Sequence, residues 1–234
     1  MIIYRRPSER ASKPDKLALE HRSLKHVPLL EGEEKLKFLN LQSNEISRID
    51  NLVSLPNLTF LDLSMNKITE INQIPQVQHL RVLILGKNQI ERMQNLQSLP
   101  NLDVLDLHDN RIQKIENLET LQKLRVLNLS NNQLQVLDIN HPMKGLHELN
   151  VRKNCISEVK DLAQMPSLQK LFLSNNKITS LASMGSLPLL SDFTCDNNPV
   201  EKLQQNLLVQ LRDKYPSLAF YNLTKVANLI DGSV

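Results

Sequence analysis

Four ionisable side chains that lie close together in the sequence could do chemistry: Asp103, Asp106, His108 and Asp109. Carboxylates and a histidine can hold a metal ion, but three aspartates at this spacing match no recognised metal-binding loop, so we predict no metal site. Two interpretations of the cluster stay open. It is a solvated face with local ion pairs, each worth little, or it is a pocket for an arginine or lysine of a protein partner.

The rest of the chain offers no catalytic constellation. Its sequence has no P-loop, zinc-protease, dithiol or serine-hydrolase motif. Five glycines among 234 residues make a phosphate-cradling loop implausible, and the six histidines are scattered. We therefore expect that the protein is not an enzyme and that it has no catalytic residues, no cofactor and no small-molecule substrate.

Asparagine recurs in this chain with a fixed period. Buried amides cost free energy unless they are hydrogen-bonded. Stacked at one position of successive turns, asparagine side chains can bond the backbone of their own turn and of the neighbouring repeat. We therefore predict a structural ladder rather than a binding site. Its eight members lie 22 residues apart: Asn44, Asn66, Asn88, Asn110, Asn132, Asn154, Asn176 and Asn198.

The frame around each asparagine predicts the fold. It reads L-x-x-L-x-L-x-x-N-x-I-x-x-I-x-x-L-x-x-L-P-x, and its period falls within the 20–29 residues of leucine-rich repeats. The stretch x-L-x-L-x predicts a short strand whose leucines point inward. We expect an α/β fold, a leucine-rich-repeat solenoid shaped as a right-handed horseshoe. Its parallel β-sheet would be concave, with short 3₁₀ or α segments on the convex side.

Repeat boundaries divide the chain into an arm, a solenoid and a tail. The fifth repeat departs from the frame around Asn140, which predicts a reshaped convex loop. The predicted parts are a flexible basic N-terminal arm (1–16), a leucine-rich-repeat domain (17–223) and a C-terminal tail (224–234). Within the domain we expect a capping half-repeat (17–35), eight repeats (36–200) and a C-terminal cap (201–223).

Composition and charge indicate which classes of partner the protein is expected to bind. The chain is 41% hydrophobic and 23% charged, and its net charge of +3 is too small to argue for nucleic acid or a membrane surface. It shows no secretory signal and no long apolar run. Two cysteines without cysteine-rich caps indicate reduced thiols. We expect a cytoplasmic protein with protein partners, and with neither nucleic acid nor a membrane among them.

Strand positions that point away from the core should carry the binding surface. Three of the five phenylalanines occupy such positions, and exposed apolar patches of this kind mark protein contacts. The alternative is that valine and phenylalanine merely suit strands. We call Phe38, Phe60, Val82 and Ile84 the apolar strip, and the acidic cluster lies beside it. The predicted protein-binding residues are Phe38, Phe60, Val82, Ile84, Asp103, Asp106, His108, Asp109, Lys170 and Phe172.

The 22-residue frame over about residues 17–223 resembles the repeats of intracellular leucine-rich adaptor proteins. That class includes the leucine-rich regulatory subunit of protein phosphatase 1 and the axonemal outer-arm dynein light chain 1. The segments GEEKLKFLNLQSNEISRI, LRVLILGKNQI, LDVLDLHDNRIQKIENL and LQKLFLSNNKI are more closely similar to the leucine-rich-repeat subunit of the tubulin polyglutamylase complex. In that family a charged, coiled-coil-prone tail follows the repeats.

The resemblance implies a non-catalytic scaffold beside a tubulin-tyrosine-ligase-like catalytic chain, on microtubules, centrioles and cilia. Two alternatives stay open: a regulatory subunit that binds an enzyme such as protein phosphatase 1, and an axonemal dynein-associated light chain. A nucleic-acid adaptor is disfavoured because the sequence has no basic stripe with stacking aromatics.

Overall fold

The computed structural model describes residues 5–72, 74, 77–203 and 206–226. The chain falls into two compact units, which we describe separately. Unit 1 comprises Met1–Ile112 and Glu116–Leu124, and unit 2 comprises Gln113–Ile115 and Arg125–Val234.

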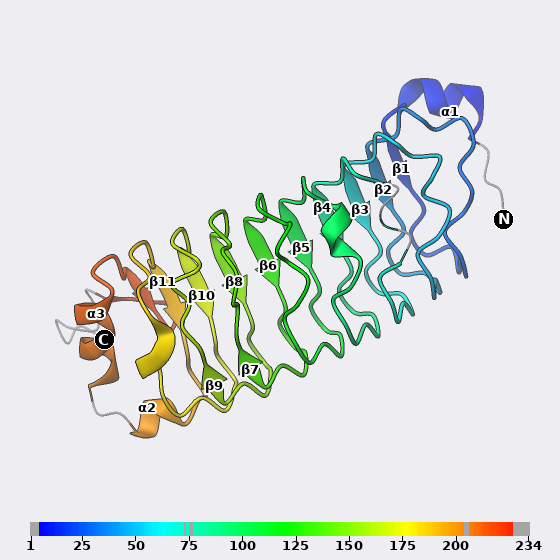
Figure 1. The fold of residues 1–234 in the computed structure, drawn as a ribbon. Coiled ribbons are helices and arrows are strands. Elements are labelled where there is room, and N and C mark those ends of the chain that lie inside the picture. The colour runs from blue at the N-terminus through cyan, green and yellow to red at the C-terminus, as the bar shows by residue number, and fades with distance from the viewer. Residues whose placement is uncertain (1–4, 73, 75–76, 204–205, 227–234) are drawn as a thin grey trace. The chain divides into compact units, whose positions relative to one another are not determined.

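Unit 1 is a stack of short parallel strands. Each strand contributes three residues in the same register to the next, so that equivalent residues of successive repeats are direct neighbours. Figure 1 shows β2 to β5 side by side along the solenoid. The elements are α1 (Pro7–Ser12), β1 (Lys16–Ala18), β2 (Phe38–Asn40), β3 (Phe60–Asp62), β4 (Val82–Ile84), η2 (Leu96–Ser98) and β5 (Val104–Asp106).

Unit 2 continues the same construction and adds a helical cap. Its main sheet runs in the order β6-β8-β10-β11-β12-β13, parallel except for the last pair. The strands are β6 (Val126–Asn128), β7 (Val136–Leu137), β8 (Glu148–Asn150), β9 (Glu158–Val159), β10 (Lys170–Phe172), β11 (Asp192–Thr194), β12 (Phe220–Tyr221) and β13 (Thr224–Lys225). The helices are η3 (Ala182–Met184), α2 (Val200–Leu203) and α3 (Leu207–Lys214).

Buried and half-buried side chains alternate along each strand, and this alternation explains why the repeats stack. In β2 to β5 the central leucine is fully buried, whereas the residues on either side are half-buried. Side chains of a strand alternate between the two faces of the sheet. One face therefore packs into the solenoid core, and the other presents its side chains to solvent. The sheet, the buried leucine rows and the 3₁₀ turns η2 and η3 agree with the predicted leucine-rich-repeat solenoid.

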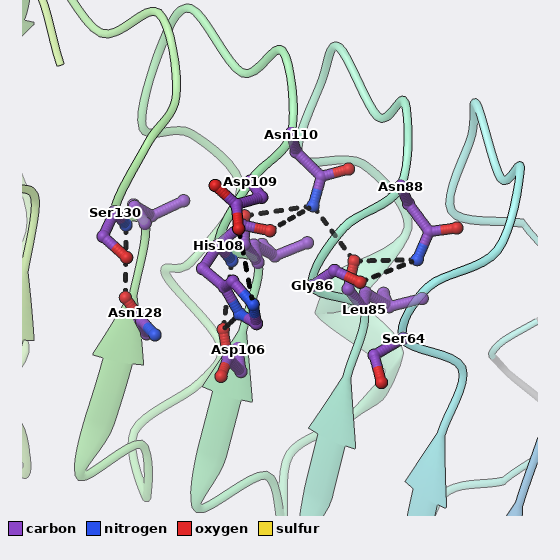
Figure 2. Close-up of polar contacts among 12 residues, drawn as sticks. Ser64, Leu85, Gly86, Asn88, Asp106, His108, Asp109, Asn110, Asn128 and Ser130 are labelled. Carbon is purple, nitrogen blue, oxygen red and sulfur yellow. Dashed lines mark hydrogen bonds and ion pairs between the residues drawn. The ribbon is translucent and has the colours of Figure 1, made fainter. Parts of the chain in front are cut away.

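Within each unit, asparagine side chains join a repeat to the one before it. The Nδ2 group of Asn110 donates to the Leu107 carbonyl of its own turn at 3.1 Å and to the Leu85 carbonyl of the preceding repeat at 3.0 Å. Its Oδ1 accepts from the Ile90 amide at 2.9 Å. Asn88 makes the equivalent bonds to its own turn and to the preceding one, and Figure 2 shows the two side chains one repeat apart. Only 8% of Asn110 is exposed, so these bonds lie away from water.

The turn that carries each asparagine has a left-handed residue in front of it. The residue that precedes a ladder asparagine has φ between 51° and 60° in all eight repeats, although none of these residues is glycine. Such a conformation costs a non-glycine residue of order 1 kcal/mol or more. The hydrogen bonds of the asparagine offset this cost, because they satisfy the backbone groups that the bend removes from the hydrogen-bonding pattern of the sheet.

Residues 5–16 differ from the flexible arm that the sequence predicts. Pro7–Ser12 form α1, and Lys16 opens β1, which pairs with β2. The Arg5 guanidinium bonds the carboxylate of Glu33, a residue that is almost fully buried. The Nε atom of Arg10 lies 3.2 Å from Oε1 of the same carboxylate. The hydrogen bond with Glu33, together with the negative charges of Glu33 and Glu9, raises the pKa of Arg5. A buried carboxylate needs such partners, and this requirement orders the segment.

At the other end, α2 and α3 cover the last repeat within the predicted cap. The Tyr215 ring is buried, its hydroxyl donates to the Gly185 carbonyl at 3.0 Å, and burial raises its pKa to about 12. The structure differs from the predicted boundary in one respect: β13 lies within the predicted tail and pairs antiparallel with β12. Residues 227–234 of that tail lie outside the described residues.

The fifth repeat departs from the others on the side away from the main sheet. There β7 and β9 form a two-stranded parallel sheet of their own, with Val136 opposite Glu158. Asn140, which the sequence marks as the point of departure, lies three residues after β7 and is exposed. The sequence does not predict the pairing of β7 with β9, because a strand of two residues is too short to show alternating polar and apolar side chains.

We predict that Asn110→Ala lowers the free energy of unfolding by about 1–3 kcal/mol, because it orphans buried backbone groups of two repeats. Chemical denaturation measures the loss. Asn140→Ala is the matched control, since the same change at an exposed asparagine should stay within about 0.5 kcal/mol. Equal stabilities of the two variants would contradict the structural role of the ladder.

We also predict that Glu33→Gln releases the N-terminal segment. Removing the carboxylate leaves the Arg5 guanidinium buried without a counter-charge, a change that costs about 3 kcal/mol where the group stays buried. Hydrogen exchange of residues 5–18 should therefore accelerate, while β3 to β5 keep their protection. The control is Glu34→Gln, because Glu34 is exposed. Unchanged exchange in Glu33→Gln would show that the ion pair does not hold α1.

Candidate functional site

The apolar strip lies on the solvent-facing side of three neighbouring strands of unit 1. Phe38, Phe60 and Val82 are direct neighbours in register, and Ile84 lies two residues beyond Val82 on β4. All four side chains are half-buried. The structure thus brings together residues that are 22 positions apart in the sequence, because parallel in-register pairing aligns equivalent positions of each repeat.

Two phenylalanines form the most ordered part of this surface. The rings of Phe38 and Phe60 stack with centroids 4.3 Å apart and an interplanar angle of 12°. Aromatic pairs of this kind contribute about 0.5–1.5 kcal/mol beyond the area that they bury. The pair is therefore held in place before a partner arrives, and little side-chain entropy remains to be lost on binding.

Asp106, His108 and Asp109 meet at the end of β5. The Nδ1 atom of His108 lies 2.8 Å from Asp106 Oδ1, and its Nε2 atom lies 3.8 Å from Asp109 Oδ2. Figure 2 shows the imidazole between the two carboxylates and beside Gly86. A Cβ atom at Gly86 would lie 2.1 Å from His108 Cε1, so the ring rests directly on the glycine backbone. Gly86 thus makes room for a histidine of the next repeat.

Asp103 does not join this group. Only 8% of the residue is exposed, and its Oδ2 atom pairs with Arg81 Nη2 at 3.2 Å. The sequence interpretation treats the three aspartates as one acidic cluster. The structure separates Asp103 from the other two because it precedes β5 and faces a cation of the preceding repeat.

Predicted binding residues Lys170 and Phe172 lie on the sheet face of unit 2, in β10. The ammonium group of Lys170 is 3.6 Å from Glu148 Oε2 of β8. The ring of Phe172 is covered by a cation, because the Arg152 guanidinium lies 4.1 Å from its centroid. Phe172 is therefore part of a cation–π pair rather than a bare apolar contact.

A chain of hydroxyl groups supports Arg152. Its Nε atom donates to Thr194 Oγ1 at 3.4 Å, and Thr194 Oγ1 lies 2.7 Å from Ser174 Oγ, which also bonds the Asp196 carboxylate. A serine hydroxyl has one proton and a carboxylate only accepts. Ser174 therefore donates to Asp196, and Thr194 donates to Ser174. Thr194 takes a strand position that should face solvent, yet only 2% of it is exposed.

An open groove borders unit 1 at its N-terminal strand. It lies between α1 and β1 and is lined by side chains of both, with Lys13, Lys16 and Arg22 as exposed cations. Phe38 belongs to the lining and so connects this groove with the apolar strip. Sequence reasoning does not find the groove, since it depends on α1 being folded. The one available signal is the concentration of basic residues before residue 23.

The two cysteines are not joined by a disulfide. Cys155 and Cys195 are both free thiols, the first exposed and the second buried. Burial raises the pKa of Cys195 to about 12, so its thiol stays protonated at neutral pH and is a poor nucleophile. Within the described residues, no group of three or more metal-binding side chains converges. Among those same residues, no helix has the length and apolarity needed to cross a membrane.

Comparison with known proteins supports the repeat assignment. Residues 34–76 and 78–120 each match the family described as Leucine Rich repeats (2 copies), and residues 122–178 and 167–193 match two further leucine-rich repeat families. The chain is 48% identical over 54 residues to the mouse protein "Leucine-rich repeat-containing protein 49". That match covers 23% of this chain and 8% of the mouse protein.

Solved structures share the fold. An internalin, InlF, from Listeria monocytogenes superposes with a TM-score of 0.66 at 22% identity, over 89% of this chain and 58% of the internalin. YopM from Yersinia enterocolitica superposes with a TM-score of 0.62 at 29% identity, over 75% of this chain and 36% of YopM. Taken with the ladder and the stacked parallel strands, these matches show that the chain belongs to the leucine-rich repeat family.

Proposed function

We propose that this protein is a non-catalytic scaffold that binds protein partners through the apolar strip of unit 1. The stacked pair of Phe38 and Phe60 is the observation that supports this proposal most strongly. The chain has only five phenylalanines and no tryptophan, and it places two of them side by side on the solvent-facing side of its sheet. Neither ring is needed to fill the core, which leucines already occupy.

The chemistry of the strip suggests what a partner presents to it. Apolar side chains of a helix or an extended segment would cover the rings and Ile84, and this burial would supply most of the binding free energy. Asp106 and Asp109 bring negative charge to the β5 end of the same face. A basic residue of the partner placed there would fix its orientation, which is the usual contribution of charge at an interface.

For the identity of the partner, we propose a subunit of a cytoskeletal complex, such as a tubulin-tyrosine-ligase-like chain of a microtubule-modifying or ciliary assembly. The support is the resemblance of segments such as GEEKLKFLNLQSNEISRI to the polyglutamylase subunit. A phosphatase-binding regulatory subunit and a dynein-associated light chain are the alternatives from the same class of adaptors. The match to the mouse relative spans about 8% of that protein's length.

We expect the double variant Phe60→Ala with Ile84→Ala to lose about 2–4 kcal/mol of partner binding if both residues are hot spots. The partner is first identified by affinity purification and mass spectrometry, and its binding is then measured by calorimetry. The variant should stay folded. Its free energy of unfolding should fall by about 1 kcal/mol, which is the contribution of one aromatic pair.

The matched control is Val53→Ala with Val209→Ala, which removes exposed apolar side chains away from the strip. Binding of the control should equal that of the wild type. Wild-type affinity in the folded double variant would place the binding surface elsewhere. Recovery of a phosphatase or of axonemal dynein, in place of a tubulin-modifying enzyme, would overturn the proposed partner but not the scaffold role.

A further inference from the structure

We propose that Arg152, whose guanidinium lies over the ring of Phe172, is a recognition site for a carboxylate side chain of an acidic peptide. Arginine is suited to this task because its planar fork can donate two parallel hydrogen bonds to a carboxylate. The site lies wholly within unit 2, on the solvent-facing side of β8, β10 and β11.

Two independent contacts fix the guanidinium. Its Cζ atom lies 4.1 Å from the centroid of the Phe172 ring, and its Nε atom donates to Thr194, which belongs to the hydroxyl chain that ends at Asp196. Arginine loses substantial rotamer entropy when it is immobilised in a complex. Here that entropy is already lost in the folded protein, so a ligand meets a preorganised donor.

The remaining donors of Arg152 are uncommitted. Its hydrogen bonds within the described residues use the backbone and Nε, and neither Nη nitrogen has a partner there. No carboxylate in the described part of the chain forms an ion pair with Arg152. A half-buried guanidinium held next to an aromatic ring, with both Nη groups unused, is the arrangement that a bidentate anion completes.

The surrounding charge favours a single carboxylate. Lys170, a neighbouring cation on β10, already pairs with Glu148, and the Asp196 carboxylate lies at the end of the hydroxyl chain. The single positive charge of Arg152 beside these acids suits a ligand of charge −1. A phosphate carries about −2 and would need a second cation to balance the repulsion from the neighbouring carboxylates.

The proposal is independent of the apolar strip, since it uses only residues of unit 2. The probe is an acetylated and amidated peptide of charge −1, Gly-Glu-Gly, and Gly-Gln-Gly is its neutral match. Nuclear magnetic resonance follows the Nε–Hε signal of Arg152 during titration. We expect a saturable shift with the acidic peptide and none with the neutral one, and the same shift in the Phe60→Ala, Ile84→Ala variant.

Substitution separates a specific site from general charge attraction. Arg152→Lys keeps the charge but loses the planar fork, so it should weaken binding of the acidic peptide about 10-fold. Phe172→Leu keeps an apolar side chain but removes the π face, and it should also weaken binding. Arg212→Lys, at an exposed arginine of α3, is the matched control and should bind as the wild type does. Unweakened binding by Arg152→Lys would overturn the proposal, and tighter binding of inorganic phosphate than of the peptide would overturn the choice of ligand.

Discussion

The hydrogen bonds of the asparagine ladder are the constraint on which the rest of the structure depends. Each repeat must turn sharply after its strand, and the turn places a non-glycine residue at positive φ and takes backbone groups out of the sheet. Away from water, those groups need partners. The ladder asparagines supply them, and they bond two successive repeats at once. Within each unit, a turn is therefore tied to the one before it, and the strands are brought into the same register.

That register also creates the surface that we propose as the binding site. Because equivalent positions are neighbours across the sheet, one substitution per repeat builds a column of adjacent side chains. The inward leucines cannot vary without leaving a cavity, but the outward positions are free to differ. In unit 1 they place Phe38 against Phe60 and continue into Val82, which makes an apolar surface. In unit 2 the equivalent positions begin with Val126 and continue with Glu148, Lys170 and Asp192, so the series changes from apolar to charged.

Long side chains on this face bond across repeats instead of pointing straight into solvent. Arg152 lies over Phe172 of the next repeat in the sheet, and His108 lies over Gly86 of the preceding one. In both cases a large planar group rests on a neighbour that supports it or leaves room for it. Such contacts restrict rotamers before any partner binds. Sites that are rigid in advance bind at a lower entropic cost than mobile ones, and this property links the stability of the solenoid to the binding that we propose for it.

The sequence by itself determined the repeat length, the ladder positions, the leucine core and the strand positions that face solvent. These follow from a fixed period, and a period is readable without coordinates. Tertiary structure alone decided which long side chains meet: Arg5 with Glu33, Asp103 with Arg81, and Arg152 with Phe172. Periodicity tells on which face of the sheet a residue lies, but the rotamer that a flexible side chain adopts depends on the shape and charge of its neighbours in other repeats. For that reason the apolar strip could be predicted from the sequence, whereas the ordered N-terminal segment and the supported arginine could not.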